Sequence, residues 1–403
     1  MDKITNKNPF KIDFLSKFFL NSELFLLKES EIRNLDNELN LFEQVNLDPD
    51  VEKRLISKNE LLASFAISKA ENSDLTLEEA ENVYKLIVEN KELDFINEKI
   101  AQKKKLTQKD LDKLEFFNIA KTFKILNSQK LDLADFNANY IKKIHFEITK
   151  GLDIFSKHLS DFTVYKSGAW RDNDKIRVGE YQPADFIIIP NAVEEIITWF
   201  KKDASVTNVA ILHNTLYAIH PFNNGNKRVC RILEHILLKS IGLNNKNLYS
   251  TSYYYHQEKA RYYKYLLGSL ERKNLNIFTP FILEAVVFSI LDTVKTSLEI
   301  KRYNFLQNSS LNKEIQKTLK PLIKKQELQF KNFYNKVKKK ISRQTFVNHL
   351  DRAVEGNIIT KRIVGKTTYY KLNLKTEESI FLDKWLKEIQ DKVSYINDDL
   401  RLV

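Results

Sequence analysis

The sequence predicts a mostly α-helical protein, with one small β-hairpin near its middle and a second near its C-terminus. Glycine and proline are scarce, at 8 and 7 of 403 residues, whereas Leu, Lys, Glu and Ile are plentiful. Apolar residues recur at spacings of three and four over most of the chain, and runs typical of strands are few. This balance favours a fold of helices packed on helices.

The N-terminal part of the chain, residues 1–130, is expected to be a helical region of its own. Between residues 10 and 130, apolar residues lie three or four apart with charged residues between them. This is the pattern of successive amphipathic helices that bury one face each.

The next region, residues 131–305, is predicted to be one domain, helical apart from a single interruption. Residues 165–190 contain glycines, an Asp-Asn-Asp run and short β-type runs, which predict a loop with a small hairpin. Helical patterns cover 135–152, 191–202, 205–219, 226–241 and 278–305.

Residues 306–375 have a different pattern, short helical segments followed by β-type runs, and are predicted to form a third domain. Two short helical patterns precede a third helix, which begins after Ser342, a good N-cap, and stops at Gly356. Two β-type runs joined near Gly365 follow. Three helices followed by a hairpin are the layout of a winged helix-turn-helix domain. The last region, 376–403, adds a helix of mixed charge that either packs on its domain or pairs two chains as a homodimer.

The net charge of +12 is concentrated in one part of the chain. Residues 301–371 hold 18 Lys or Arg and 4 Asp or Glu, and the remainder is close to neutral. Such a local excess indicates a polyanionic partner, with nucleic acid first, and a solvated lysine-rich surface is the alternative. Together with the winged-helix layout it favours duplex DNA, with a plain protein-contact domain of the same shape as the alternative. Arg343 and Gln344 open the third helix and are the candidates for contacts with base edges.

Composition also excludes several classes of protein. The single cysteine, Cys230, excludes an internal disulfide framework and a cysteine-based zinc site. No secretory pattern is visible at the N-terminus and no apolar run reaches 18 residues. We therefore expect a cytoplasmic protein with no membrane contact.

The segment HPFNNGNKRVCR, residues 220–231, carries the clearest chemistry. His220 precedes a loop of small residues, and the loop leads into a helix. A loop that enters a helix N-terminus gathers unpaired backbone N–H groups and suits a phosphate. Arg228 and Arg231 lie three apart and share one face of that helix. A base, an anion nest and two guanidinium groups together indicate work on a phosphoryl group.

This segment closely resembles the signature of the Fic/Doc family, HPFx(D/E)GN(G/K)R. The flanking runs IHFEITKGL, SGAWR, KIRVG and RYYKYL resemble elements of that family in the same order, so that the resemblance covers about 131–305. It implies a helical Fic-type core with the hairpin as a flap. It also implies a nucleotidyltransferase that moves AMP from ATP to a Ser, Thr or Tyr hydroxyl of a target protein.

The resemblance assigns roles to individual residues. His220 would be the general base, which takes the proton of the target hydroxyl. The nucleotide would be held by Gly225, Asn226, Lys227, Arg228 and Arg231. The flap that positions the target would include Lys175, Ile176, Arg177 and Val178.

Asn224 departs from the family pattern, Lys227 takes the second of the two residues that the pattern allows, and both positions keep alternatives open. Asn224 stands where the family has the carboxylate that holds Mg²⁺, and an amide oxygen is a weaker ligand for that ion. Weak catalysis would make the protein a nucleotide-sensing, DNA-binding regulator. Lys227 stands where many members have glycine. Lysine at this position is known in the Doc branch, whose members can act as protein kinases. Arg231, which that branch lacks, favours AMP transfer.

An upstream stretch, ASFAISKAENSDLTLEEA, resembles the inhibitory segment (S/T)xxxE(G/N) found in some Fic proteins. Glu71 and Asn72 match its end, although Ile67 occupies the Ser/Thr position and Ser68 comes one residue later. The resemblance implies that Glu71 pairs with Arg231 and blocks the γ-phosphate site. In some members this glutamate also serves the removal of AMP.

Overall fold

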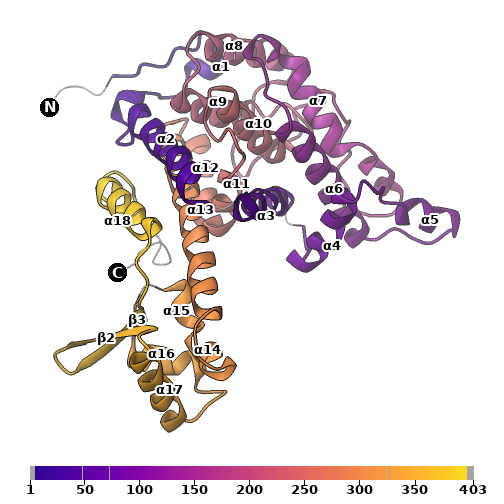
Figure 1. Ribbon diagram of the computed structural model, residues 1–403. Coiled ribbons are helices and arrows are strands. Elements are labelled where there is room, and N and C mark those ends of the chain that lie inside the picture. The colour runs from indigo at the N-terminus through magenta and orange to yellow at the C-terminus, as the bar shows by residue number, and fades with distance from the viewer. Residues whose placement is uncertain (1–4, 48, 72, 326, 397–403) are drawn as a thin grey trace. The chain divides into compact units, whose positions relative to one another are not determined.

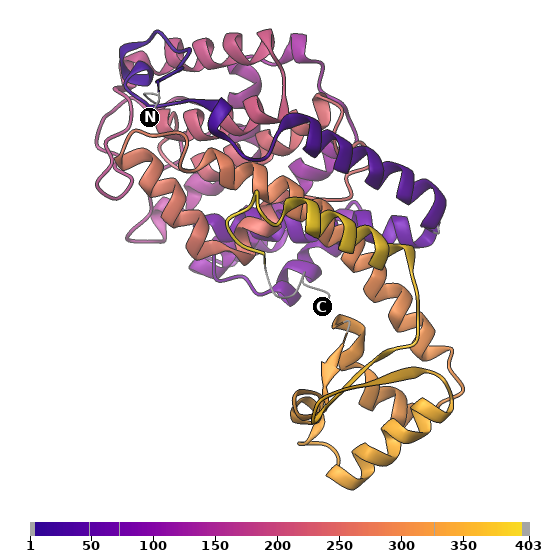
Figure 2. The same cartoon turned by 90° about the vertical axis from the view of Figure 1, so that its left-hand side faces the viewer.

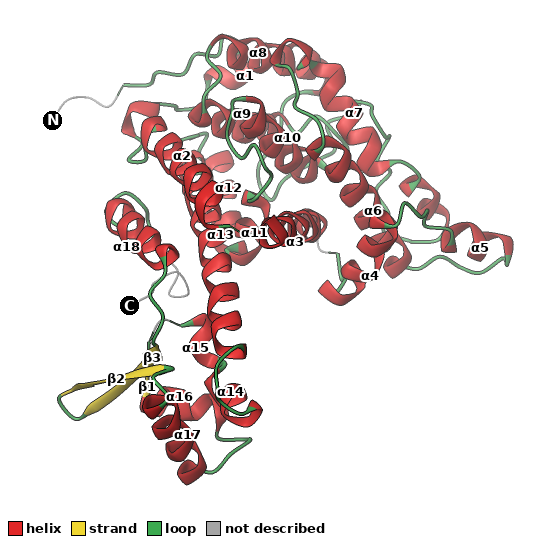
Figure 3. Ribbon diagram, viewed as in Figure 1, coloured by secondary structure: helices red, strands yellow, loops and turns green. Residues whose placement is uncertain are grey.

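The computed structural model describes residues 5–47, 49–71, 73–325 and 327–396, which are mostly helical with one small sheet (Figures 1 and 3). This confirms the predicted fold class. The chain divides into a first unit, residues 1–37 and 56–289, and a second unit, residues 38–55 and 290–403. In the described part of the chain, no helix combines the length and the apolar character needed to cross a membrane.

The N-terminal part of the chain is helical, as expected. Helix α4 begins with a reciprocal cap, in which Thr76 and Glu79 bind each other's backbone N–H groups, and Thr107 and Asp110 do the same for α6. The helices are α1 (Asp13–Ser16), α2 (Glu29–Asn46), α3 (Pro49–Ser68), α4 (Leu77–Val88), α5 (Phe95–Ala101) and α6 (Gln108–Asn127), with 3₁₀ turns at Ser22–Leu24 and Lys69–Glu71. Asn72, the last residue of the expected inhibitory motif, lies outside the described residues.

The centre of the first unit is helix α9, which packs between α8 and α10. Its residues are buried almost without exception, as expected for a helix that is apolar on all sides. The α9–α10 connection is therefore held at both ends by rigid helices. The helices around it are α7 (Ala138–Thr149), α8 (Ile189–Lys202), α9 (Val206–Ile219), α10 (Asn226–Ser240), α11 (Thr251–Gln257) and α12 (Lys259–Glu271), with 3₁₀ turns at Leu133–Asp135, Leu152–Lys157 and Phe186–Ile188.

The predicted hairpin within residues 165–190 is smaller than expected. Val178 and Tyr181 form a single antiparallel bridge, closed by two backbone hydrogen bonds of 3.1 Å, and no strand extends from it. Gly179 turns the chain with a φ of 60°, which glycine adopts without strain. Residues 174–184, called the flap from here on, are therefore a tight turn whose shape depends on contacts at its base.

The second unit has an apolar core to which its helices and strands both contribute. Its three-stranded antiparallel sheet has the order β1-β3-β2, and Figure 2 shows the long hairpin of this unit beside its helices. Phe333, Phe346, Leu350 and Tyr370 belong to that core. Its elements are β1 (Leu328–Gln329), β2 (Ile359–Val364), β3 (Thr367–Leu372), α14 (Lys313–Leu319), α15 (Pro321–Lys324), α16 (Phe330–Val337), α17 (Arg343–Glu355) and α18 (Glu377–Ile389), while α13 (Thr279–Gln307) spans both units. Helices precede a hairpin, as the sequence predicts, and the winged helix-turn-helix assignment itself stays a prediction. The predicted division into four regions, with boundaries at residues 130, 305 and 375, also stays a prediction.

Candidate active site

The candidate base, His220, lies at the point where helix α9 ends. It adopts the left-handed backbone conformation, with a φ of 55° and a ψ of 61°, which is uncommon for a residue other than glycine. The residue is 8 % exposed, and its Nδ1 has no hydrogen-bond partner among the described residues. Burial, followed by the nearby charges of Arg171 and Lys227, lowers the pKa of His220 to about 3. The imidazole is therefore neutral at physiological pH and able to accept a proton.

The loop between α9 and α10 is held in one conformation by side chains. Asn226 accepts from the backbone N–H of Phe222 at 3.0 Å and donates to the carbonyl of Phe222 at 2.8 Å. The Phe222 ring stacks on His145, with centroids 3.8 Å apart. Because the N–H of Gly168 donates to Nδ1 of His145, the neutral ring donates through Nε2 to the carbonyl of Asn224. The N-terminus of α10 is thus preorganised.

Gly225 precedes that helix with a φ of 81°, in the left-handed region. A Cβ at this position would come within 3.5 Å of the His145 ring. The Cβ contact is an ordinary one, so it is the backbone conformation that favours glycine here. The first N–H groups of α10 have no acceptors within the helix, as at any helix N-terminus, and this suits an anion.

One pocket of about 410 Å³ brings most of the predicted site residues together. Its wall includes His220 and the start of α10 on one side and part of the flap on the other. Lys175 belongs to the predicted flap set but does not line this pocket, and its side chain is exposed. The lining residues are Glu71, Thr163, Ile176, Arg177, Val178, Gly179, Tyr217, His220, Asn223, Asn224, Gly225, Asn226, Lys227, Tyr263, Leu266 and Leu267.

Lys227 is the motif cation that faces this pocket. Its Nζ lies 3.4 Å from the Glu71 carboxylate, 3.3 Å from the carbonyl of Ala70 and 5.1 Å from the centroid of the Tyr263 ring. The side chain remains partly exposed. Lys227 thus supplies the counterion of the predicted inhibitory glutamate.

Arg231 has other partners than the sequence analysis expected. Its Nη1 donates to the carbonyl of Ala66 at 3.0 Å, and its guanidinium lies over the rings of Tyr255 and Tyr262. Ala66 is in the last turn of α3, where free carbonyl groups and the helix dipole attract a cation. In this structure Glu71 therefore pairs with Lys227, while the C-terminus of α3 holds Arg231.

Arg228 is fully buried and also engaged. Its Nη1 lies 2.6 Å from a carboxylate oxygen of Glu115, and its Nη2 donates to the hydroxyl of Tyr165 at 3.2 Å. Burial raises the pKa of Glu115 to about 7, against the opposing charge of Arg228. Glu115 was missed by the sequence analysis. Its spacing of four from Leu111 and from Ile119 places a carboxylate on the buried face of α6, which is a signal for a buried cation.

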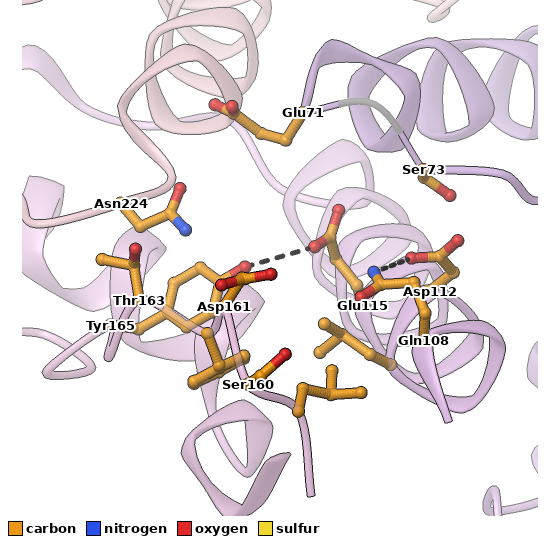
Figure 4. Close-up of a pocket in the computed structure, with 13 residues that line it drawn as sticks. Glu71, Ser73, Gln108, Asp112, Glu115, Ser160, Asp161, Thr163, Tyr165 and Asn224 are labelled. Atoms are coloured by element: carbon orange, nitrogen blue, oxygen red, sulfur yellow. Dashed lines mark hydrogen bonds between the residues drawn. The ribbon is translucent and has the colours of Figure 1, made fainter. Parts of the chain in front are cut away.

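Glu115 and Tyr165 also line a second pocket of about 340 Å³, which shares Glu71, Thr163 and Asn224 with the first (Figure 4). Figure 4 shows polar side chains from several segments around this space, with the tyrosine hydroxyl directed at the Glu115 carboxylate. Asp112 is fixed there by the backbone N–H of Asp74 and the amide of Gln108. This pocket has an acidic lining.

The surroundings of Asn224 do not fit a resident Mg²⁺ ion. The side-chain oxygen of Asn224 accepts from the N–H of Gly225 at 2.7 Å and from Nη2 of Arg228 at 3.4 Å. Mg²⁺ requires oxygen ligands in an octahedral arrangement, whereas N–H donors occupy this oxygen and a guanidinium lies beside it. Within the described residues, no group of three His, Cys, Asp or Glu side chains is arranged to hold a metal.

The two predicted DNA contacts lie in the second unit. Arg343 and Gln344 are exposed on the first turn of α17. The amide of Gln344 donates to Asn348 at 3.1 Å, and the Arg343 guanidinium lies 5.8 Å from the centroid of the Phe330 ring.

Comparison with known proteins finds similarity over part of the chain. A family model described as Fic/DOC family matches residues 135–238. A probable protein adenylyltransferase of Aquifex aeolicus is 34 % identical over 80 residues, which are 19 % of this chain and 25 % of that protein. A protein adenylyltransferase of Caenorhabditis elegans is 26 % identical over 175 residues, 40 % of this chain and 32 % of that protein. The chain thus spans about a quarter to a third of the length of these relatives.

The fold is also similar to a solved structure. The crystal structure of a Fic family protein from Desulfovibrio desulfuricans aligns with 86 % of this chain and 95 % of that one, at a TM-score of 0.50 and 18 % identity. At this identity the likeness concerns the fold alone.

Proposed function

We propose that the protein transfers AMP from ATP to a Ser, Thr or Tyr hydroxyl of a target protein, because residues 135–238 match the Fic/DOC family model. The observation that carries this proposal is the pocket in which a neutral histidine, the N-terminus of a helix and the flap meet. The similar adenylyltransferases support the same chemistry.

In the proposed reaction, the target hydroxyl attacks the α-phosphorus of ATP and His220 takes its proton. A bond forms between the hydroxyl oxygen and the α-phosphorus, the bond to the β-phosphate oxygen breaks, and pyrophosphate leaves. The backbone N–H of Asn226 stabilises the negative charge on the α-phosphate, and the N–H of Gly225 joins it once it leaves the side-chain oxygen of Asn224. The flap aligns the target segment by strand-like pairing.

The basic residues of the motif hold the β- and γ-phosphates in this scheme. Lys227 already faces the pocket, whereas Arg228 and Arg231 are engaged with Glu115 and Ala66. Productive binding therefore requires that phosphate oxygens replace these partners. Arginine suits such an exchange, because its fork of donors matches phosphate oxygens as well as carboxylates.

We propose that Glu71 inhibits the reaction by neutralising Lys227. A carboxylate 3.4 Å from Nζ occupies the place that a phosphate oxygen would take. ATP can then bind with its terminal phosphates displaced, and its α-phosphorus is out of line with the target hydroxyl. The same carboxylate lines the pocket beside His220 and is placed to orient a water molecule, which would serve AMP removal.

The position of the transferred label tests this function. The chain is incubated with ATP labelled on the α- or the γ-phosphate, and covalent label on protein is measured. AMP transfer predicts α-label on the protein and no γ-label. Transfer of γ-label alone would contradict AMP transfer and favour a kinase. Absence of both labels under any divalent metal, even in Glu71→Gly, would favour a nucleotide-sensing protein.

A second activity, binding of duplex DNA, is favoured by the charge of the C-terminal segment. Residues 313–372 carry their Lys and Arg side chains exposed or partly exposed around the apolar core. We propose that α17 contacts base edges through Arg343 and Gln344 and that the β2–β3 hairpin contacts phosphates.

The full chain should therefore bind duplex DNA with a strong dependence on salt. Arg343→Ala should weaken binding to a preferred sequence by about 1–3 kcal/mol and relax its selectivity, as measured by fluorescence anisotropy. Absence of binding at low salt would make the segment a protein-contact module.

A further inference from the structure

Arg171, in the loop before the flap, is a buried charge with an unusual set of partners. Its side chain is 1 % exposed, although charged groups are rarely buried without compensation. Its one ion pair in the described structure is with Asp174, whose own side chain is 39 % exposed. Most of the compensation therefore comes from backbone carbonyl groups.

Those carbonyl groups belong to two separate segments. At the end of α9, Nε of Arg171 donates to the carbonyl of His220 at 2.8 Å, and the backbone N–H of Arg171 donates to the carbonyl of Pro221 at 2.8 Å. At the base of the flap, Nη1 donates to the carbonyl of Asn173 at 2.7 Å, and Nη2 donates to the carbonyl of Ala184. One guanidinium thus joins the backbone of the catalytic histidine to both ends of the flap.

The conformation of His220 explains why a planar, multivalent donor is needed here. The left-handed turn at the end of α9 leaves carbonyl groups outside the helical hydrogen-bond pattern. Arginine offers five N–H donors in a rigid fork, whereas lysine offers three donors on a point charge. Only the fork can reach carbonyl groups on both segments at once.

Two further contacts join the same segments. The hydroxyl of Tyr181, in the flap, donates to the carbonyl of Ala218 at 2.9 Å. The amide of Asn173 donates to Asn223 at 3.4 Å. Asp174 also accepts from the N–H of Phe186 at 2.9 Å, which closes the base of the flap. Because the flap has a single backbone bridge of its own, its position depends on these contacts.

We propose that Arg171 is a positioning residue that holds the catalytic base and the target-binding flap as one unit. This inference rests on the proposed roles of His220 and the flap. It goes beyond them because no part of the phosphate-binding motif contains Arg171, and its guanidinium reaches the reacting groups only through backbone carbonyls.

The charge of Arg171 has a second effect on the base. Burial is the largest cause of the low pKa of His220, and Arg171 is the next. Removal of this charge should therefore raise the pKa of the imidazole without restoring its ordinary value. The other titratable or charged groups around this pocket are Tyr217 on α9, Lys227 on α10, Tyr263 on α12, Arg177 in the flap and Glu71.

Two substitutions separate the effect of the guanidinium N–H donors of Arg171 from the effect of its charge. Arg171→Met removes both, and Arg171→Lys keeps the charge but loses the fork. The matched control is Lys166→Met, which removes an exposed cation of the same loop that pairs with Asp172. Each is measured by amide hydrogen exchange of the flap, by NMR titration of the His220 ring, and by self-modification with α-labelled ATP in a Glu71→Gly background.

We expect Arg171→Met to speed exchange in the flap at least ~10-fold, to raise the titration midpoint of His220, and to lower the labelling rate by about 100-fold. Arg171→Lys should loosen the flap while the midpoint of His220 stays low. Lys166→Met should behave as the parent chain.

Unchanged flap exchange in a folded Arg171→Met or Arg171→Lys variant would overturn the proposal. If Arg171→Met does not fold, Arg171→Lys alone decides by the same criterion. Exchange and titration require no turnover, so they test the coupling even if no AMP is transferred, an outcome that would overturn the proposed function alone.

Discussion

The candidate active site and the helix–hairpin segment at residues 313–372 use charged side chains in opposite ways. In the active site, Arg171, Arg228 and Arg231 are at most 3 % exposed, and each has defined partners. In residues 313–372, no Lys or Arg among the described residues is buried.

The difference follows from solvation. A buried charge must recover its lost hydration from a few fixed groups, so each pair defines one geometry. An exposed lysine keeps its hydration and is screened by salt, so it contributes only a small part of the total electrostatic attraction of the segment. Single substitutions should therefore have large effects in the active site and small ones in the C-terminal segment.

Removal of the buried base should have the largest effect. His220→Ala deletes the group that accepts the hydroxyl proton, and general-base catalysis contributes roughly 10²–10⁴-fold. We expect covalent α-label to fall by at least ~100-fold. The matched control, His158→Ala, removes a histidine that does not line the pocket and should retain the parent rate. Equal labelling by His220→Ala and the parent would remove His220 from the mechanism.

Release of the Glu71 contact should produce the next largest change, in the opposite direction. Glu71→Gly frees Lys227 for a phosphate oxygen, and correct alignment of the α-phosphorus is worth roughly 100-fold in rate. Initial rates of self-modification with α-labelled ATP should rise accordingly, with a smaller change in ATP affinity. Glu78→Gln, an exposed glutamate on the first turn of α4, is the control.

The double variant Glu71→Gly with Arg231→Ala should lose most of that gain, because the γ-phosphate then lacks its arginine. An unchanged rate in Glu71→Gly, with an active parent, would show that this segment is structural and that control lies elsewhere.

Glu115 should make the free energy of unfolding depend on pH. Its pKa is raised from 4.5 to about 7, so the folded chain retains a proton that the unfolded chain releases. Stability from this group is complete below pH 4.5 and is lost as the pH rises through 7. The parent should lose about 3 kcal/mol relative to Glu115→Gln across this range.

Urea unfolding at a series of pH values, followed by tryptophan fluorescence, measures this difference. Glu147→Gln removes a carboxylate from an exposed pair with Lys150 and should follow the parent. Parallel stability curves for the parent and Glu115→Gln would contradict the raised pKa.

A single lysine of the β2–β3 hairpin should have the smallest effect. Lys366 is exposed beside Gly365, so Lys366→Ala should change the free energy of unfolding by no more than about 0.5 kcal/mol. If the segment binds DNA, affinity should fall uniformly across sequences and the salt slope should decrease by about one. A sequence-selective loss would instead indicate that Lys366 reads bases.

Much of the fold could be predicted because its signals are local. Ser342 caps α17 through the N–H of Thr345, as its position in the sequence suggests. The helix limits around the motif agree to within a few residues, since apolar periodicity and capping act over one or two turns. The flap was less predictable, because one bridge and contacts with α9 replace the expected strands.

The sequence by itself determined which chemistry gathers at residues 220–231 and that the basic charge lies in the C-terminal part of the chain. It could not determine which charges meet. Glu115 lies 113 positions before Arg228, Glu71 lies 156 before Lys227, and Arg171 lies 49 before His220. Such pairs form only when helices from distant parts of the chain pack together. Burial then removes water as a competing hydrogen-bond partner, so each cation binds the nearest carbonyl oxygen or carboxylate. For that reason tertiary structure assigned Glu71 to Lys227 and Arg231 to the end of α3.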